Sequence, residues 1–142
     1  MDQVRIKVSG CPNSCGQHHI ADIGFFGGAR KINDRLVPHF QMLIGGRTAE
    51  GQAAFGKNTI KLPARRIPEA VVEMLTLYRR DRQSATETFQ AFSDRVGLDY
   101  WKNALQEFTT LPSYEEAPAM YRDWGAETEF SLDDLGPGEC AA

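Results

Sequence analysis

The chain has 142 residues, of which 42% are apolar and 25% charged, as in an ordinary globular protein with one core. No apolar run approaches the roughly 20 residues of a membrane span, and the net charge is only −3, so we expect neither a membrane nor a nucleic acid as partner. Three cysteines, an odd and low count, argue against a disulfide scaffold, and since the first residues resemble no secretion signal, we expect a cytoplasmic protein.

The first half of the chain predicts β-strands, because its apolar residues alternate with polar ones or form short runs. Residues 4–8 alternate with period two, which predicts a strand with one buried face. A strand so near the start needs neighbours, and we expect some of them to come from sequence that precedes this chain. Further strands are predicted at residues 20–26, 37–44 and 57–62, ended by Gly27-Gly28, Gly45-Gly46 and Pro63.

Helical periodicity follows the strands. One face of a first helix carries Ile67, Val71, Leu75 and Tyr78. A capping box from Ser84 to Glu87 predicts the start of a second helix, which Gly97 ends. A third helix is predicted from Leu98 to Phe108. Together these elements predict an α+β fold, with a small mixed or antiparallel sheet of about four strands followed by about three helices.

The C-terminal part lacks periodicity, and residues 113–142 hold eight acids against one base. The remaining residues carry fifteen bases and eleven acids, a mildly basic balance that favours anionic ligands or an acidic protein partner. Four large rings are too many for a disordered tail and predict an extended arm that packs on the body or on a partner: Tyr114, Tyr121, Trp124 and Phe130. We therefore predict a body at 1–110 and an arm at 111–142.

Between the first two strands lies a loop with two cysteines four residues apart, Cys11 and Cys15. Thiolates are soft ligands that suit iron–sulfur clusters or zinc. Pro12 suits the start of a tight turn or helix, and a helical loop would place both sulfurs on one face. Asn13 adds an amide between the two cysteines, and the remaining cysteine, Cys140, lies near the end of the chain.

Three other interpretations of the loop remain open. A zinc site could use both cysteines with His18 or His19, but it lacks an evident fourth ligand. A redox dithiol usually has two intervening residues, whereas this loop has three. The thiols could also be inert and buried.

Three other features outside the cysteine loop can be interpreted from the sequence. His39 is predicted to lie on the surface of a strand. Arg65-Arg66 precedes a helix start, where a base is unfavourable, which favours an anion contact there slightly more than at the arginines that end the helix. Gly45-Gly46-Arg47 could hold an anion or a cofactor edge, or could simply end a hairpin.

Several stretches resemble the nitrite and sulfite reductases that contain sirohaem and a 4Fe–4S cluster. The stretch Ser9-Gly10-Cys11-Pro12-Asn13-Ser14-Cys15, with residues 20–25 after it, is similar to the second cysteine motif of that family. Residues 40–47 and 61–70 also resemble it. The likeness extends from about Val4 to Phe108.

This resemblance implies that Cys11 and Cys15 supply two of four cluster ligands, and that Cys15 also bridges to the sirohaem iron. It implies that Asn13 lies beside the cofactors, and that the complete enzyme reduces sulfite to sulfide or nitrite to ammonia with six electrons. The other two cysteines belong to an earlier C-x5-C motif that this chain lacks. We therefore expect no catalytic residues and no bound cofactor in the chain alone.

The implied partners are the N-terminal portion of the reductase, which carries the other two cysteines, and an electron donor such as ferredoxin or a flavoprotein. Two alternatives from other classes stay open. The chain could be a non-catalytic binding module of the same fold, or a small zinc or electron-carrier protein.

Overall fold

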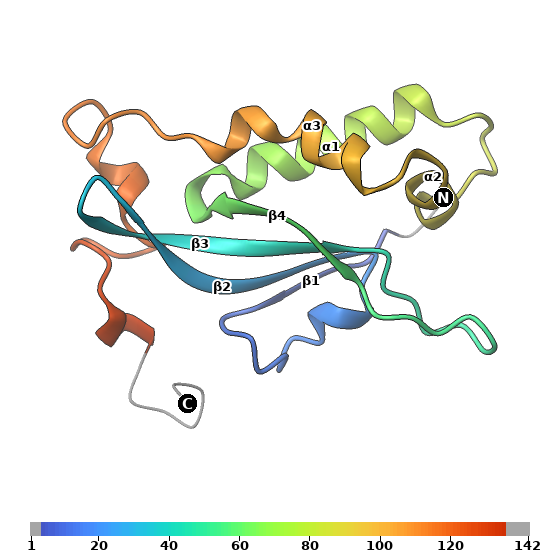
Figure 1. Cartoon of the computed structure of the whole chain (residues 1–142), viewed down its shortest axis with the longest axis horizontal. Coiled ribbons are helices and arrows are strands. Elements are labelled where there is room, and N and C mark those ends of the chain that lie inside the picture. The colour runs from blue at the N-terminus through green and yellow to red at the C-terminus, as the bar shows by residue number, and fades with distance from the viewer. Residues whose placement is uncertain (1–3, 136–142) are drawn as a thin grey trace.

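The computed structural model describes residues 4–135 and confirms the predicted α+β class (Figure 1). One sheet holds four strands in the order β1 (Ile6–Ser9), β2 (Ile23–Ile32), β3 (Arg35–Ile44) and β4 (Lys57–Pro63). β1 runs parallel to β2, and the other neighbours are antiparallel. Helices α1 (Ile67–Asp81), α2 (Phe89–Val96) and α3 (Leu98–Ala104) follow. In Figure 1, α1 and α3 lie over one side of the sheet, and the loop between β1 and β2 lies on the other.

The second predicted strand was placed correctly but ended too early. β2 continues through Gly27 and Gly28 to Ile32, because β3 pairs with it along its whole length. The two strands meet in a two-residue turn in which Asn33 and Asp34 have φ angles of 49° and 63°. Such left-handed pairs match the twist of a tight hairpin, so the turn fixes the register of the central strands.

The core lies between the sheet and the helices. Phe25 and Met42 are paired across β2 and β3, and both are fully buried. They pack in one cluster with Leu62 from β4 and with Phe92 and Trp101 from the helices. The buried face of α1 is formed by Ala70, Met74, Leu77 and Tyr78, so the predicted face was only partly right, since it included Leu75. Burial of this apolar surface between the layers is the main source of stability in a fold of this kind.

β1 departs from its prediction, because its apolar face is not covered. Ile6 is 40% exposed and Val8 is 54% exposed. β1 is an edge strand with a single neighbour, β2. Within the described residues, β1 therefore presents exposed apolar side chains beside an unpaired strand edge.

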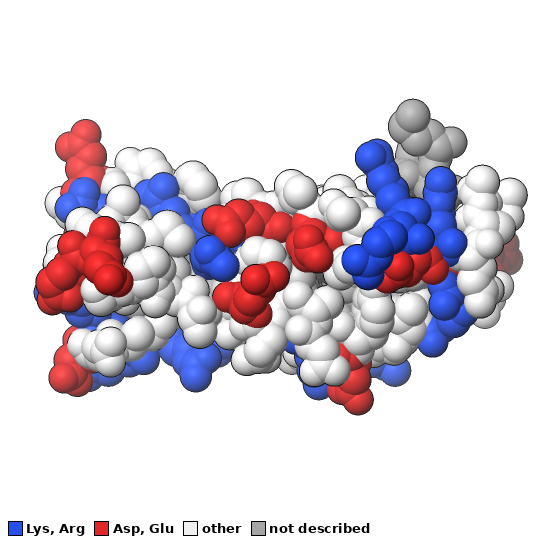
Figure 2. Space-filling model, turned by 90° about the horizontal axis from the view of Figure 1, so that it is seen from above, with Lys and Arg blue, Asp and Glu red and all other residues white. Residues whose placement is uncertain are grey.

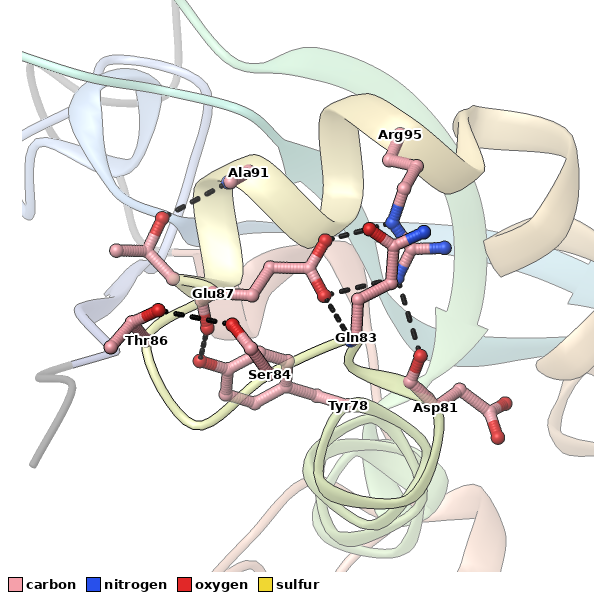
Figure 3. Close-up of polar contacts among 9 residues, drawn as sticks. Tyr78, Asp81, Gln83, Ser84, Thr86, Glu87, Ala91 and Arg95 are labelled. Atoms are coloured by element: carbon pink, nitrogen blue, oxygen red, sulfur yellow. Dashed lines mark hydrogen bonds and ion pairs between the residues drawn. The ribbon is translucent and has the colours of Figure 1, made fainter.

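The predicted capping box at Ser84 does not start α2. The helix begins four residues later, where the Thr88 hydroxyl accepts a hydrogen bond from the Ala91 N–H at 3.1 Å. Glu87 instead holds the turn before the helix, accepting from Arg95 at 2.7 and 3.0 Å and from the Gln83 N–H at 2.7 Å (Figure 3). The acidic residue that suggested a cap thus fastens the α1–α2 connection to α2.

Replacing Glu87 with glutamine should lower the melting temperature at pH 7, and the difference from the wild type should shrink in acid. The hydrogen bonds from Arg95, and then from Gln83, hold the pKa of Glu87 below its ordinary value of 4.5. A carboxylate with a lowered folded pKa stabilises the fold above its unfolded pKa, and that contribution is lost as the pH falls through the folded value. Thermal unfolding of both proteins between pH 7 and pH 3 measures this.

The control for this experiment is Glu50→Gln, which alters an exposed loop carboxylate that no described residue pairs with. It should change the melting temperature little at any pH. A Glu87→Gln deficit that stays constant down to pH 3 would show that the charge of Glu87 has no part in the turn.

The arm packs on the body over its described residues, 111–135. The rings of Tyr121 and Phe130 are buried. The Tyr121 hydroxyl donates to the carbonyl oxygen of Pro112 at 2.7 Å, which satisfies its polar end. The arm therefore contributes two of its four large rings to the folded structure, and Cys140 lies outside the described residues.

The other two rings of the arm stack on arginines of the body. Trp124 is largely exposed, but its indole N–H donates to the Ala64 carbonyl oxygen at 3.0 Å. The Arg65 guanidinium lies 4.3 Å from the centre of the Trp124 ring, and that of Arg35 lies 3.5 Å from the centre of the Tyr114 ring. These cation–π contacts join an acidic arm to a basic body.

Candidate functional site

The two predicted ligand cysteines lie on a loop that leaves the sheet after β1, here called the cysteine loop and defined as residues 10–17. Cys11 is half-buried, Cys15 is exposed, and both are free thiols. The loop is built of turns rather than the helix considered above. Ser14 and Gln17 have φ angles of 62° and 58°, a left-handed conformation that disfavours residues with a side chain.

Glycines let this loop and the following 3-10 turn, η1 (His18–Ile20), lie directly on the backbone of the sheet. A Cβ added to Gly24 of β2 would sit 2.0 Å from the His18 carbonyl oxygen. One added to Gly27 would sit 2.3 Å from the carbonyl oxygen of Gly10, and one added to Gly16 would sit 2.2 Å from that of Val8. No side chain fits at these distances, so the glycines fix how closely the loop approaches the sheet.

The Gly45-Gly46-Arg47 stretch turns out to support the same loop. A Cβ at Gly46 would lie 2.5 Å from the His19 carbonyl oxygen, which also accepts a hydrogen bond from the Gly56 N–H at 2.7 Å. Arg47 donates to Asp94 of α2 at 2.8 Å. Gly46 therefore allows the backbone of η1 to lie close to the β3–β4 connection, and Arg47 ties that connection to α2.

The base of the cysteine loop contains a buried polar group that the sequence interpretation missed. The Ser9 hydroxyl accepts a hydrogen bond from the Gly16 N–H at 3.0 Å and lies 2.7 Å from Nδ1 of His18. His18 is fully buried, and its burial, followed by the nearby His19, lowers its pKa. A lowered pKa keeps the imidazole neutral at pH 7.

The sulfur donors fit half of a four-cysteine cluster site. Among residues 4–135, no three His, Cys, Asp or Glu side chains come together closely enough to hold a metal ion. The zinc set of Cys11, Cys15 and His18 or His19 is thus not assembled in this part of the chain. A cubane cluster takes four thiolates, and this loop carries two cysteines. Asn13 is exposed on the loop between them.

Two other expectations outside the loop were wrong. His39 is buried in β3, where its Nδ1–H donates to the Val37 carbonyl oxygen at 2.9 Å. The Arg65 guanidinium is not available for an anion, because it donates to the carbonyl oxygens of Arg122 and Asp123 at 3.1 and 2.9 Å. Partners 57 and 58 residues away in the chain explain why sequence spacing could not reveal the role of Arg65.

The helical side of the molecule exposes charges of both signs. Figure 2 views this side from above and shows lysines and arginines interleaved with aspartates and glutamates. Several of these charges are paired, for example Arg80 with Asp81 at 2.7 Å. Among the described residues, no helix is long and apolar enough to cross a membrane.

The chain is similar to enzymes of known activity. It is 28% identical to a sulfite reductase (ferredoxin) from Synechococcus elongatus over 82% of this chain and 17% of that enzyme. It is 28% identical to an assimilatory ferredoxin-dependent nitrite reductase from Haloferax mediterranei over 95% of this chain and 22% of that enzyme. The chain therefore spans about a fifth of the length of these relatives.

A solved structure and a family model agree with these relatives. The NirA protein of Mycobacterium tuberculosis superposes with a TM-score of 0.60 and 29% identity, covering 66% of this chain and 17% of NirA. The model of the nitrite and sulphite reductase 4Fe-4S domain matches residues 2–112, which include the whole sheet, the cysteine loop and the three α-helices. The chain belongs to the nitrite and sulphite reductase 4Fe-4S domain family.

Proposed function

We propose that this chain is the C-terminal, cluster- and sirohaem-binding portion of a reductase that converts sulfite to sulfide or nitrite to ammonia with six electrons. The observation that carries the proposal is the pair of free thiols on a glycine-packed loop inside the family match. When bound, the two cofactors would supply the electron transfer and the binding of the substrate oxyanion.

Cys11 and Cys15 would hold two irons of the cluster, and the two remaining ligands would come from the preceding portion. Cys15, which matches the family's cysteine between the two cofactors, would couple them for electron delivery, and it is the more exposed of the two thiols. Asn13 would place its amide beside the cofactors. The residues on either side of Cys15 are small: Ser14, which is left-handed, and Gly16. A large planar group could therefore approach the backbone around Cys15.

The partner that completes the site would pack on β1. Ile6 and Val8 expose apolar surface on an edge strand, and the relatives are about five times longer than this chain. Residues 1–110 would then form the family body, and residues 111–142 an acidic arm. Ferredoxin is the donor named for the relatives, and we propose it here, with a flavoprotein as the alternative donor and the cytoplasm as the compartment.

The chain purified alone is expected to be colourless, because two thiolates cannot close a four-cysteine cluster within one monomer. Iron, acid-labile sulfide and zinc analysis, with an absorption spectrum, tests this. A brown sample with a broad band near ~400 nm and about four irons per chain would contradict the proposal. Iron should also be counted per dimer, since two copies could share one cluster, and stoichiometric zinc would favour the zinc-protein alternative.

A further inference from the structure

The residue that closes the cysteine loop is Ser9, the last residue of β1, which is only 3% exposed. We propose that Ser9 is a positioning residue, whose hydroxyl fixes the arrangement in which Cys11 and Cys15 are presented to the cluster. The inference rests on the proposed function for its cluster. The anchoring of the loop by one buried hydroxyl does not depend on the cluster and can be tested in this chain alone.

The position of the hydrogen bonds supports this role. Ser9 stands two residues before Cys11, and Gly16 directly follows Cys15. The 3.0 Å hydrogen bond from the Gly16 N–H to the Ser9 hydroxyl therefore joins the two ends of the segment that carries both thiols. A short connection across the base of a loop restricts every residue between its ends.

The second hydrogen bond extends this anchor to η1. The Ser9 oxygen lies 2.7 Å from Nδ1 of His18, the first residue of η1. A hydroxyl that accepts from Gly16 can donate its own proton to Nδ1 of a neutral imidazole. One side chain thus satisfies a partly buried backbone donor and a buried ring nitrogen, and it ties the loop to the turn that lies on Gly24.

The local backbone needs such an anchor. Ser14 and Gln17 adopt left-handed conformations, which free chains of these residues rarely hold. Gly16 cannot be anchored by a side chain of its own, because a Cβ there would lie 2.2 Å from the Val8 carbonyl oxygen and 2.8 Å from the Ser9 hydroxyl. The Lys7 ammonium donates to the Gln17 side chain at 2.7 Å, but this pair is exposed and so holds the loop more weakly.

A fixed loop matters for ligand binding. If the two sulfurs already occupy one arrangement, the cluster does not have to order them when it binds, and the affinity is higher. Loss of the Ser9 hydroxyl would leave the Gly16 N–H and Nδ1 of His18 buried without their partner, which favours an opened loop. The thiols would remain present but would sample many positions.

The experiment compares Ser9→Ala with Ser93→Ala in the 142-residue chain. Ser93 is also buried, at 6% exposed, but its hydroxyl has no hydrogen-bond partner among the described residues, so this control removes the same atom without removing an anchor. In Ser9→Ala, hydrogen exchange at the Gly16 amide should accelerate by about 10-fold or more. In Ser93→Ala it should stay within about twofold of the wild type.

The rate of cysteine alkylation is a second measure of how far the cysteine loop opens. Half-buried Cys11 should react several-fold faster with iodoacetamide in Ser9→Ala, as measured by peptide mass spectrometry, while exposed Cys15 changes little and serves as the internal reference. If Ser9→Ala does not fold, the pair Ser9→Thr and Ser9→Val replaces it, because these side chains have the same shape and only threonine keeps the hydroxyl. Wild-type exchange in Ser9→Val would overturn the inference, as would equal exchange in Ser9→Ala and Ser93→Ala.

The cluster itself is tested in the complete enzyme. Ser9→Ala should lose iron to a chelator several-fold faster than the wild type and show a shifted cluster spectrum in electron paramagnetic resonance, and Ser9→Thr should restore both. Unchanged iron loss and spectrum in Ser9→Ala would refute the positioning role. A complete enzyme whose wild type holds no cluster would instead refute the proposed function, while the amide exchange would still decide whether Ser9 anchors the loop.

Discussion

Gly24→Ala should destabilise the chain by about 3 kcal/mol or more, the upper end of what a forced insertion into a packed interior produces. The new Cβ would lie 2.0 Å from the His18 carbonyl oxygen, and that oxygen belongs to backbone, which cannot rotate out of the way. Either β2 or η1 must move, and the cysteine loop moves with η1. Urea unfolding followed by circular dichroism measures the change in the free energy of unfolding.

The matched control for Gly24→Ala is Gly28→Ala in the same strand. No atom lies within 4 Å of a Cβ placed at Gly28, and its backbone is not left-handed. The control should therefore change the free energy of unfolding by less than about 1 kcal/mol, in the stabilising direction if the unfolded chain loses freedom. Equal effects of the two substitutions would mean that the close approach of η1 to β2 does not hold the loop.

In the complete enzyme, Cys15→Ser should abolish reductase activity, whereas Cys140→Ser should leave it near the wild-type level. A hydroxyl is a hard, weakly acidic ligand and would replace the proposed cluster thiolate poorly, so electron delivery through the proposed cluster would fail. Activity with a chemical reductant, measured beside the absorption spectrum, separates loss of cofactor from loss of fold. Near-wild-type activity of Cys15→Ser would remove the role assigned to the cysteine loop.

Much of the fold could be predicted from the sequence because its signals are local. The apolar period of α1 and the apolar run of β3 depend only on neighbouring residues, and the strand predicted at residues 37–44 is observed at Arg35–Ile44. The errors arose where residues far away in the sequence determine the local structure. Gly27-Gly28 suggests a strand end, but β3 pairs with both residues, and the carbonyl oxygen of Gly10 leaves no room for a side chain at Gly27.

The sequence pointed to the two cysteines of the candidate site, but not to the residues that hold their loop in place. Two cysteines at this spacing suggest a soft-metal site from sequence alone. The hydroxyl of Ser9 and the buried ring of His18 carry no such signal, because a serine before a glycine usually marks only the end of a strand. Ser9 and His18 are nine residues apart in the chain, and they meet only because the cysteine loop folds back onto β1.

The most direct test of the central claim is to produce this chain together with the preceding portion of its protein and to analyse the purified complex. Four irons and four acid-labile sulfides per complex are predicted, and Cys11→Ser or Cys15→Ser in this chain should remove them. A stable complex that contains no iron, or one that keeps its full iron content in both variants, would contradict the assignment of this chain as the cluster-binding portion of a nitrite or sulfite reductase.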